Sequence, residues 1–294
     1  MTHRFAKAAR FIACLLLCTA VPAVYASESA DTKASMATLQ IPSHGSQLNA
    51  IVYVAAGAGP HPAVILLHGF PGNERNLDLA QDMRRAGWDV LYFNYRGAWG
   101  TPGDFSFANS IEDVSSAIAY LRDPKNAAKL RIDPSKIVLI GHSMGGFMAT
   151  QGAAADPAIK GIALISGADM AGMFQQVRAK EPTQAAAAKK MGAMLAEEGL
   201  APLHGVTPDG LGQELADHTA KWVFSSTVDA LKSRPVFVIT SDDGLAPSDG
   251  AFAEALRKAG DTQVAALHLP TDHAYSDKRL ELSQALLKWL ATVR

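Results

Sequence analysis

From residue 62 onward, short runs that are entirely apolar alternate with longer stretches that mix apolar and polar residues. Strands without a polar face are buried on both sides, which is typical of a mostly parallel sheet covered by helices. The pattern predicts such strands at residues 63–67, 90–93, 137–140, 162–165, 236–239 and 264–267. It predicts helices at about residues 77–86, 110–122, 144–155, 249–259 and 277–293. The chain is therefore expected to have an α/β fold.

Two segments depart from this alternation. Residues 36–41 and 48–54 predict an antiparallel hairpin, because the Pro-Ser-His-Gly sequence between them is typical of a turn. Residues 167–233 contain no good parallel strand but include Ala- and Met-rich helical sequence, such as 183–198. We expect this second segment to be a helical cap over the carboxyl edge of the sheet, where ligands bind in such folds.

Large apolar side chains of the predicted cap leave two interpretations open. They either line a substrate pocket or pack the cap onto the sheet. The residues concerned are Met170, Met173, Phe174, Met191 and Met194.

The strand predicted at residues 137–140 runs directly into the sequence Gly-His-Ser-Met-Gly-Gly, in which the serine is Ser143, and then into a predicted helix. A sharp strand-to-helix turn of this kind lifts a serine hydroxyl above the sheet as a nucleophile. The turn needs small residues on both sides, because its backbone is strained and the helix passes close to the strand. The motif therefore predicts Ser143 as a catalytic nucleophile.

A serine hydroxyl needs a base to take its proton and an acid to orient that base. The predicted strand at residues 236–239 is followed by a loop that contains Asp243, and the last predicted strand is followed by His273. Both loops leave the carboxyl edge of the sheet, where Ser143 is also expected. We therefore predict His273 as the base and Asp243 as the acid.

Other acids remain open as alternatives. Asp242 shares the loop with Asp243, and the sequence does not fix which of the two side chains faces the base. Asp169 follows the strand at residues 162–165 and is a further substitute, whereas Asp272 is expected to have a surface role.

In these motifs the chain resembles the α/β-hydrolases, and more narrowly the serine hydrolases related to dienelactone hydrolase and prolyl oligopeptidase. The resemblance covers nearly all of residues 27–294 and implies a Ser143, Asp243 and His273 triad in the order serine, acid, histidine. It also implies the α/β-hydrolase fold, a mostly parallel central sheet flanked by helices, with the cap inserted at about residues 167–233.

The same resemblance assigns roles to two further motifs. The His-Gly pair before Phe70 matches the family's oxyanion loop, which implies that the backbone N–H groups of Phe70 and Met144 form the oxyanion hole. The Tyr-Arg-Gly sequence around Arg96 matches a turn to which we assign a structural role. In that role we expect Arg96 to bond loop carbonyls.

The first 26 residues follow the pattern of a secretory signal peptide. Basic residues precede an apolar stretch at residues 11–24, and the sequence Val-Tyr-Ala before Ser27 is an acceptable cleavage site. The alternative, a membrane anchor, is disfavoured because the stretch is shorter than the ~20 residues that span a bilayer and contains Pro22. We therefore expect an exported protein, periplasmic or secreted, without stable membrane insertion.

Cleavage of this leader changes the charge and the cysteine count. It would remove three of the 27 basic residues and none of the 28 acidic ones, which leaves a net charge of −4 and argues against a nucleic-acid partner. It would also remove Cys14 and Cys18, so the mature chain would have no disulfide and no cysteine metal site. No His or acid spacing resembles a metal site, and we expect no cofactor.

Together these motifs predict a serine hydrolase that cleaves small or medium carboxylic esters through an acyl-enzyme. A serine peptidase of the prolyl oligopeptidase-like type that acts on short peptides is the second interpretation. A non-catalytic ligand-binding homologue and an acyltransferase that uses an acceptor other than water are further alternatives.

Overall fold

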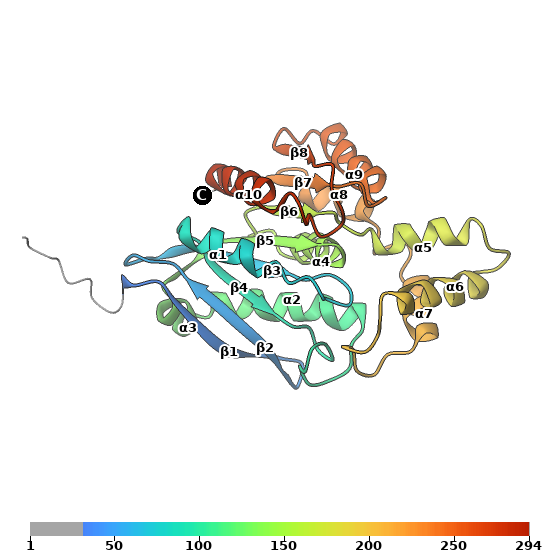
Figure 1. The fold of residues 1–294 in the computed structure, drawn as a ribbon, viewed down its shortest axis with the longest axis horizontal. Helices are drawn as coiled ribbons and strands as arrows, with labels where there is room; N and C mark the ends of the chain where they lie inside the picture. The colour runs from blue at the N-terminus through green and yellow to red at the C-terminus, as the bar shows by residue number, and fades with distance from the viewer. Residues whose placement is uncertain (1–31, 294) are drawn as a thin grey trace, which may run out of the picture.

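Eight strands form one sheet within residues 32–293, the part of the chain that the computed structural model describes (Figure 1). Their order across the sheet is β1-β2-β4-β3-β5-β6-β7-β8. The β1–β2 and β2–β4 pairs are antiparallel, and the other five pairs are parallel. The strands are β1 Ser35–Ser43, β2 Ser46–Val54, β3 His61–Leu67, β4 Asp89–Phe93, β5 Ile132–His142, β6 Ile162–Ile165, β7 Val236–Thr240 and β8 Val264–His268.

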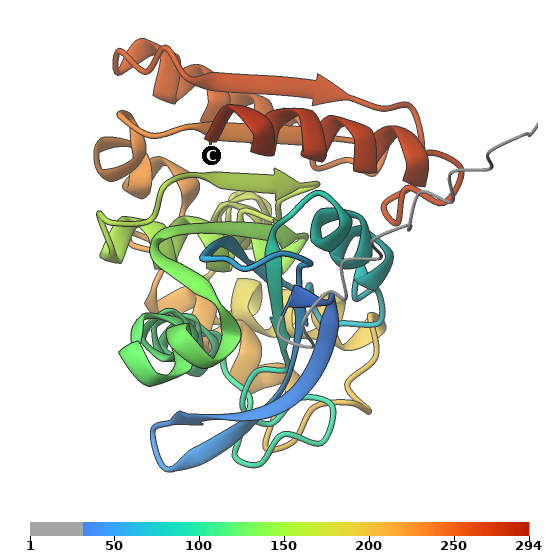
Figure 2. The same cartoon turned by 90° about the vertical axis from the view of Figure 1, so that its left-hand side faces the viewer.

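Helices cover both faces of this sheet (Figure 2). Apolar side chains of α1 and α10 form one core cluster with one face, and those of α2, α4 and α9 form a second cluster with the other face. The helices are α1 Leu77–Arg85, α2 Phe107–Arg122, α3 Pro124–Leu130, α4 Met144–Ala155, α5 Met170–Arg178, α6 Gln184–Glu197, α7 Pro208–Asp217, α8 Val228–Leu231, α9 Ala246–Lys258 and α10 Arg279–Val293.

The fold class predicted from the alternation of apolar runs is confirmed. Every residue of β3 and β4 is buried, as expected for strands covered on both sides. The entry hairpin is also present as β1 and β2, which pair in antiparallel register from Ser35 opposite Val54 to Ser43 opposite Ser46.

The structure corrects several predicted boundaries. The helix α2 begins three residues before the predicted start, because the Ser106 hydroxyl accepts the Asn109 N–H and caps the helix. The helix α9 also begins earlier, at Ala246, because Pro247 fits the first helical turn. The helix α3, capped by the Asp123 carboxylate, was not predicted, since its seven residues are too short for helical periodicity to stand out.

The segment between β6 and β7 contains α5, α6 and α7, which project together from one side of the sheet domain (Figure 1). Several contacts tie this segment to the domain below it, among them backbone hydrogen bonds of Trp99 with Pro202 and of Phe105 with His204. Ala98 forms an antiparallel β-bridge with Leu203, and the Glu214 carboxylate of α7 accepts the N–H groups of Phe107 and Ala108 at 3.1 and 2.9 Å. Those two N–H groups belong to the first turn of α2, so α7 caps a helix of the sheet domain.

The predicted signal peptide, residues 1–26, lies outside the described residues. Within residues 32–293, no helix has the combination of length and apolar character that a membrane span requires.

Candidate active site

Ser143 lies on the sharp turn between β5 and α4. Its φ of 56° is positive, which is unusual for a residue other than glycine, and its N–H donates to the Ile165 carbonyl at 3.0 Å. Two residues later, a Cβ atom on Gly145 would lie 2.1 Å from the Leu67 carbonyl oxygen of β3. The close contact of α4 with β3 therefore requires glycine there, and it holds the serine in its strained conformation.

His273 and Asp243 are in direct contact. The Nδ1 atom of His273 lies 2.7 Å from Oδ2 of Asp243, and the other carboxylate oxygen accepts the Leu245 N–H at 2.9 Å. The Asp243 side chain is buried at 5% exposure, whereas 42% of the His273 side chain is exposed. This arrangement fixes the proton of a neutral His273 on Nδ1 and leaves Nε2 as the basic atom.

Three buried hydroxyl groups lie beside this carboxylate. Ser166 Oγ lies 3.0 Å from Ser241 Oγ and 2.9 Å from the Tyr275 hydroxyl, which itself donates to the Ile239 carbonyl. Burial acts to raise the pKa of Asp243, but hydrogen bonds from His273, Ser166, the Leu245 N–H and Ser241 hold the pKa of that carboxyl well below its usual range. The carboxylate is therefore ionised throughout the physiological pH range.

The alternative acids make other contacts. Asp242 is exposed and lies 3.1 Å from Nε2 of His268. Asp169 caps α5 by accepting the Gly172 N–H and also accepts the Phe224 N–H, while the exposed Asp272 accepts the Ser276 N–H. Asp243 is thus the acid of this set that is bonded to His273.

His142 is a neighbour of His273 that sequence reasoning left without a role. Its Nε2 atom lies 2.8 Å from the His273 carbonyl oxygen, and the two ring centroids are 4.6 Å apart. Burial and the nearby His273 lower the pKa of His142 to about 4, so the ring is neutral near pH 7 and its Nε2–H donates to that carbonyl. The motif position of His142 carried no signal for this contact, because the sequence separation is 131 residues.

The predicted oxyanion residues come from two different turns. Phe70 follows β3, and Met144 is the first residue of α4, where helix geometry leaves backbone N–H groups without helical partners. The loop before Phe70 is held by His68, whose buried ring has Nδ1 2.8 Å from the Gly69 carbonyl. Burial lowers the pKa of His68 to about 4.

All five predicted site residues line one cavity of about 460 Å³. They are Ser143, Asp243, His273, Phe70 and Met144. The remaining wall comes mostly from α5 and α6, in the segment predicted as the cap. The structure therefore brings together residues from four separate loops in one cavity beside α5 and α6.

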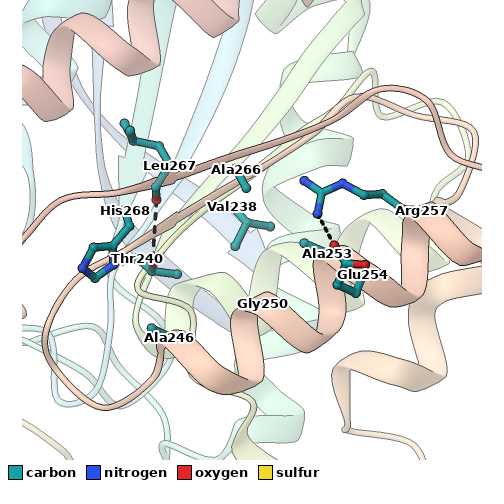
Figure 3. Close-up of a pocket in the computed structure, with 10 residues that line it drawn as sticks. All are labelled: Val238, Thr240, Ala246, Gly250, Ala253, Glu254, Arg257, Ala266, Leu267 and His268. Carbon is teal, nitrogen blue, oxygen red and sulfur yellow. Dashed lines mark hydrogen bonds and ion pairs between the residues drawn. The ribbon is translucent and has the colours of Figure 1, made fainter.

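A different cavity, of about 360 Å³, lies between β8 and α9 (Figure 3). Its wall includes small side chains such as Ala246, Ala253 and Ala266, together with an ion pair of Arg257 with Glu254 at 2.6 Å. It does not include Ser143.

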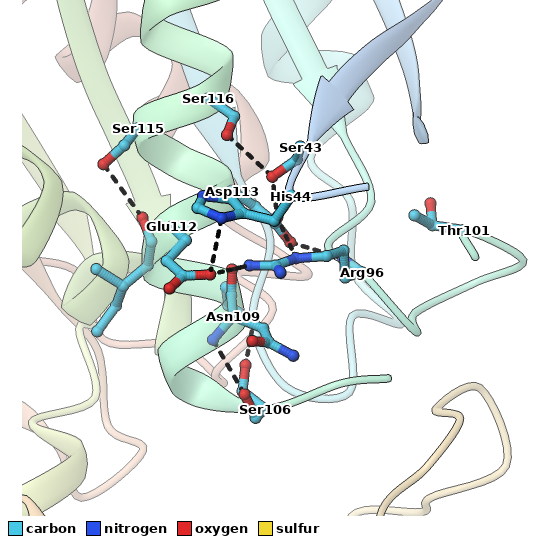
Figure 4. Close-up of polar contacts among 12 residues, drawn as sticks. Ser43, His44, Arg96, Thr101, Ser106, Asn109, Glu112, Asp113, Ser115 and Ser116 are labelled. Carbon is cyan, nitrogen blue, oxygen red and sulfur yellow. Dashed lines mark hydrogen bonds and ion pairs between the residues drawn. The ribbon is translucent and has the colours of Figure 1, made fainter. Parts of the chain in front are cut away.

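The turn around Arg96 is held by carboxylates of α2 (Figure 4). The Arg96 side chain donates to Asp113 at 2.7 Å and to Glu112 at 2.5 Å, and Ser43 of β1 donates to Asp113 at 2.6 Å. The prediction that Arg96 bonds loop carbonyls is wrong for these contacts, since the carbonyl that accepts from it, that of Asn109, belongs to a helix. The sequence could not indicate these partners, because they lie 13 to 17 residues away.

Comparison with known proteins gives the same fold. The esterase Est1E from Butyrivibrio proteoclasticus superposes with a TM-score of 0.64 at 18% identity, over 87% of this chain and 98% of that chain. An esterase from the archaeon Pyrobaculum calidifontis superposes with a TM-score of 0.60 at 22% identity, over 88% of this chain and 87% of that chain. A further structure of Est1E has ferulic acid bound.

The sequence comparisons cover different lengths of the chain. An uncharacterized protein of Mycobacterium tuberculosis is 29% identical over 106 residues, so the match spans 36% of this chain and about a third of the length of that curated relative. The sequence pattern of the Alpha/beta hydrolase family, in contrast, matches residues 64–284, from β3 into α10. That match includes the strands from β3 to β8 and every residue that lines the cavity with Ser143. The chain therefore belongs to the α/β-hydrolase family.

Proposed function

We propose that this chain is an exported serine hydrolase that cleaves carboxylic esters, with Ser143 as nucleophile, His273 as general base and Asp243 as the acid that orients the base. The observation that carries the proposal is the 2.7 Å contact of Asp243 with His273 in the cavity that Ser143 also lines. An ionised acid on Nδ1 leaves Nε2 of the base free to take a proton from a hydroxyl.

The reaction would proceed in two steps, acylation of Ser143 and hydrolysis of the acyl-enzyme. The Ser143 oxygen attacks the ester carbonyl as its proton moves to His273, and the N–H groups of Phe70 and Met144 stabilise the negative oxygen that results. The C–O bond to the alcohol then breaks, and the alcohol leaves with the proton from His273. Water, deprotonated by the same histidine, attacks the acyl-enzyme, and the carboxylic acid leaves as the serine hydroxyl is restored.

The choice of esters over amides rests on the solved proteins with this fold, several of which are described as esterases. The peptidase is the second candidate, because Glu197 and Glu198 in the cavity lining are carboxylates that suit a peptide amino terminus. Export rests on the signal-peptide pattern of residues 1–26 alone.

The decisive experiment compares p-nitrophenyl esters of graded chain length, methyl ferulate and aminoacyl-p-nitroanilides as substrates of the wild type and of Ser143→Ala. Ester turnover that Ser143→Ala abolishes, together with labelling of the wild type by a fluorophosphonate, is the expected result. Turnover of the anilides alone would favour the peptidase. No labelling, in parallel with a hydrolase that labels, would favour a binding protein. Fractionation of cells that express the full chain, with N-terminal sequencing for a start at Ser27, tests export.

A further inference from the structure

We infer that the α5–α6 wall of the cavity favours an ester with an apolar chain and disfavours a chain that ends in a carboxylate. The inference rests on the proposed function, since it concerns the substrate of the same cavity. Three features of that wall support it: the helix face that forms it, the exposure of its apolar side chains and the sign of its charges.

One continuous face of α6 lines the cavity. Met191, Met194, Leu195 and Glu198 all line it, and their spacing of three, one and three residues places them on the same side of a helix. The neighbouring side of α6 is closed by α7, because a Cβ atom on Gly192 would lie 1.9 Å from the Pro208 carbonyl oxygen. The contact with α7 therefore fixes which face of α6 the substrate meets.

Part of this face is apolar but is not used for folding. Met191 is fully buried and Met170 of α5 is nearly so, which accounts for them as core residues. Met194, however, is 41% exposed, and it is one of only three large apolar side chains in residues 32–293 that stand so exposed. An exposed thioether beside a catalytic serine offers a surface that an apolar chain can cover, and its flexible side chain adapts to different shapes.

The charges of the cavity are all of one sign. Its lining contains the carboxylates of Asp243, Glu197 and Glu198 and, among the described residues, neither lysine nor arginine. Glu197 and Glu198 are exposed at the C-terminal end of α6, whose last turn has no basic residue. The partial negative charge of a helix C-terminus disfavours acids at that position, so helix stability does not account for them. A substrate carboxylate would meet repulsion there and no counter-charge.

The expected discrimination is moderate because these carboxylates are exposed to water. For carboxylates a few ångströms apart, screening by water and salt leaves an effect of roughly 10-fold in kcat/KM. An apolar substrate chain that covers Met194 removes apolar surface from water. We therefore expect kcat/KM for esters with longer acyl or alcohol groups to exceed that for acetate by roughly 5-fold, from the area of one methionine side chain.

The test compares p-nitrophenyl acetate, p-nitrophenyl hexanoate and the mono-p-nitrophenyl ester of adipic acid, which has the same chain length as hexanoate but ends in a carboxylate. A second series, hexyl acetate and the acetate ester of 6-hydroxyhexanoate, makes the same comparison in the alcohol part. We expect the carboxylate-terminated ester to be the poorer substrate in at least one series, and the difference to narrow in about 0.5 M NaCl because salt screens exposed charges.

Two variants with matched controls assign the effect to residues. Glu197→Gln/Glu198→Gln is expected to raise kcat/KM for the adipate ester, relative to kcat/KM for hexanoate, by roughly 10-fold. Met194→Ala is expected to lower hexanoate turnover relative to acetate. Glu254→Gln in α9 and Met36→Ala in β1, an acid and an exposed methionine outside this cavity, should change neither ratio.

The outcomes separate the two proposals. Equal turnover of charged and neutral esters in both series, or a ratio that the double variant leaves unchanged, overturns the inference while the proposed function stands. Absence of turnover with every ester, at the level of Ser143→Ala, overturns the proposed function and the inference with it.

Discussion

Nδ1 of His273 lies 2.7 Å from Oδ2 of Asp243, whereas the adjacent acid, Asp242, is exposed beside His268. Two neighbouring carboxylates of the loop after β7 thus have different histidine partners: His273 lies in the loop after β8, and His268 is the last residue of β8. Substitution of each acid in turn therefore separates their roles.

The first prediction concerns this pair. Asp243→Asn should lower kcat for a p-nitrophenyl ester by about 10³–10⁴-fold, because an amide no longer holds His273 in the required tautomer. Asp242→Asn should remain within a few-fold of the wild type, and thermal unfolding of both variants serves as the control for folding. A larger loss with Asp242→Asn than with Asp243→Asn would reverse the assignment.

His142 is predicted to position the base through the His273 backbone. His142→Phe removes the Nε2–H that donates to the His273 carbonyl, so we expect kcat to fall by roughly 10-fold with little change in KM, as for a loss of orientation at the reacting centre. His142→Gln keeps an N–H donor and should recover part of the rate. Equal rates for the wild type and His142→Phe, from the same steady-state assays, would remove this role.

Asp89 is predicted to make folding stability depend on pH. Burial raises the pKa of Asp89 to about 7 from 3.8, although the Ala55 N–H and the charge of Arg131 oppose the rise. The folded chain therefore holds a proton that the unfolded chain has lost, and the contribution of Asp89 to stability falls as pH rises from about 4 to 7 and then levels off.

Asp89→Asn has no carboxyl group to titrate at this position. Its free energy of unfolding, relative to that of the wild type, should therefore increase by up to about 4 kcal/mol as pH rises from about 4 to 7. Urea unfolding at several pH values measures the difference. A constant difference across the range would contradict the prediction.

Glu214 is predicted to anchor the helical segment above the cavity. Glu214→Ala leaves the partly buried N–H groups of Phe107 and Ala108 without their acceptor, which should cost about 1–3 kcal/mol of stability. It should also raise KM, because α7 packs against the side of α6 next to the face that lines the cavity. Gln213→Ala, the exposed neighbour on α7, is the matched control for both thermal unfolding and ester kinetics.

Features that depend on neighbouring residues could be predicted from the sequence. The alternation of apolar runs gave the sheet and its helices, and glycines next to Ser143 marked the turn because the close approach of strand and helix is encoded within six residues. His273 and Asp243 were predicted because each follows a strand, and strand ends meet at one edge of a parallel sheet.

Contacts made by the folded chain alone could not be predicted. Ser166 reaches the acid loop from β6 with a positive φ of 44°, a conformation for which its sequence carries no signal. The contact of His142 with the His273 carbonyl depends on the pairing of distant segments. The choice between Asp242 and Asp243 depended on the turn after β7, and side-chain direction in such a turn is set by tertiary packing rather than by residue type.

Because Glu214 of α7 accepts the amides at the first turn of α2, the segment between β6 and β7 cannot be exchanged between related chains without regard to α2. A replacement for the segment between β6 and β7 must bring its own acceptor for the amides of Phe107 and Ala108, in the position of Glu214. A graft that keeps this carboxylate and the glycine of α6 that contacts Pro208 can vary the cavity-facing side chains of α5 and α6, while the loops at the strand ends that carry Ser143, Asp243 and His273 stay as they are.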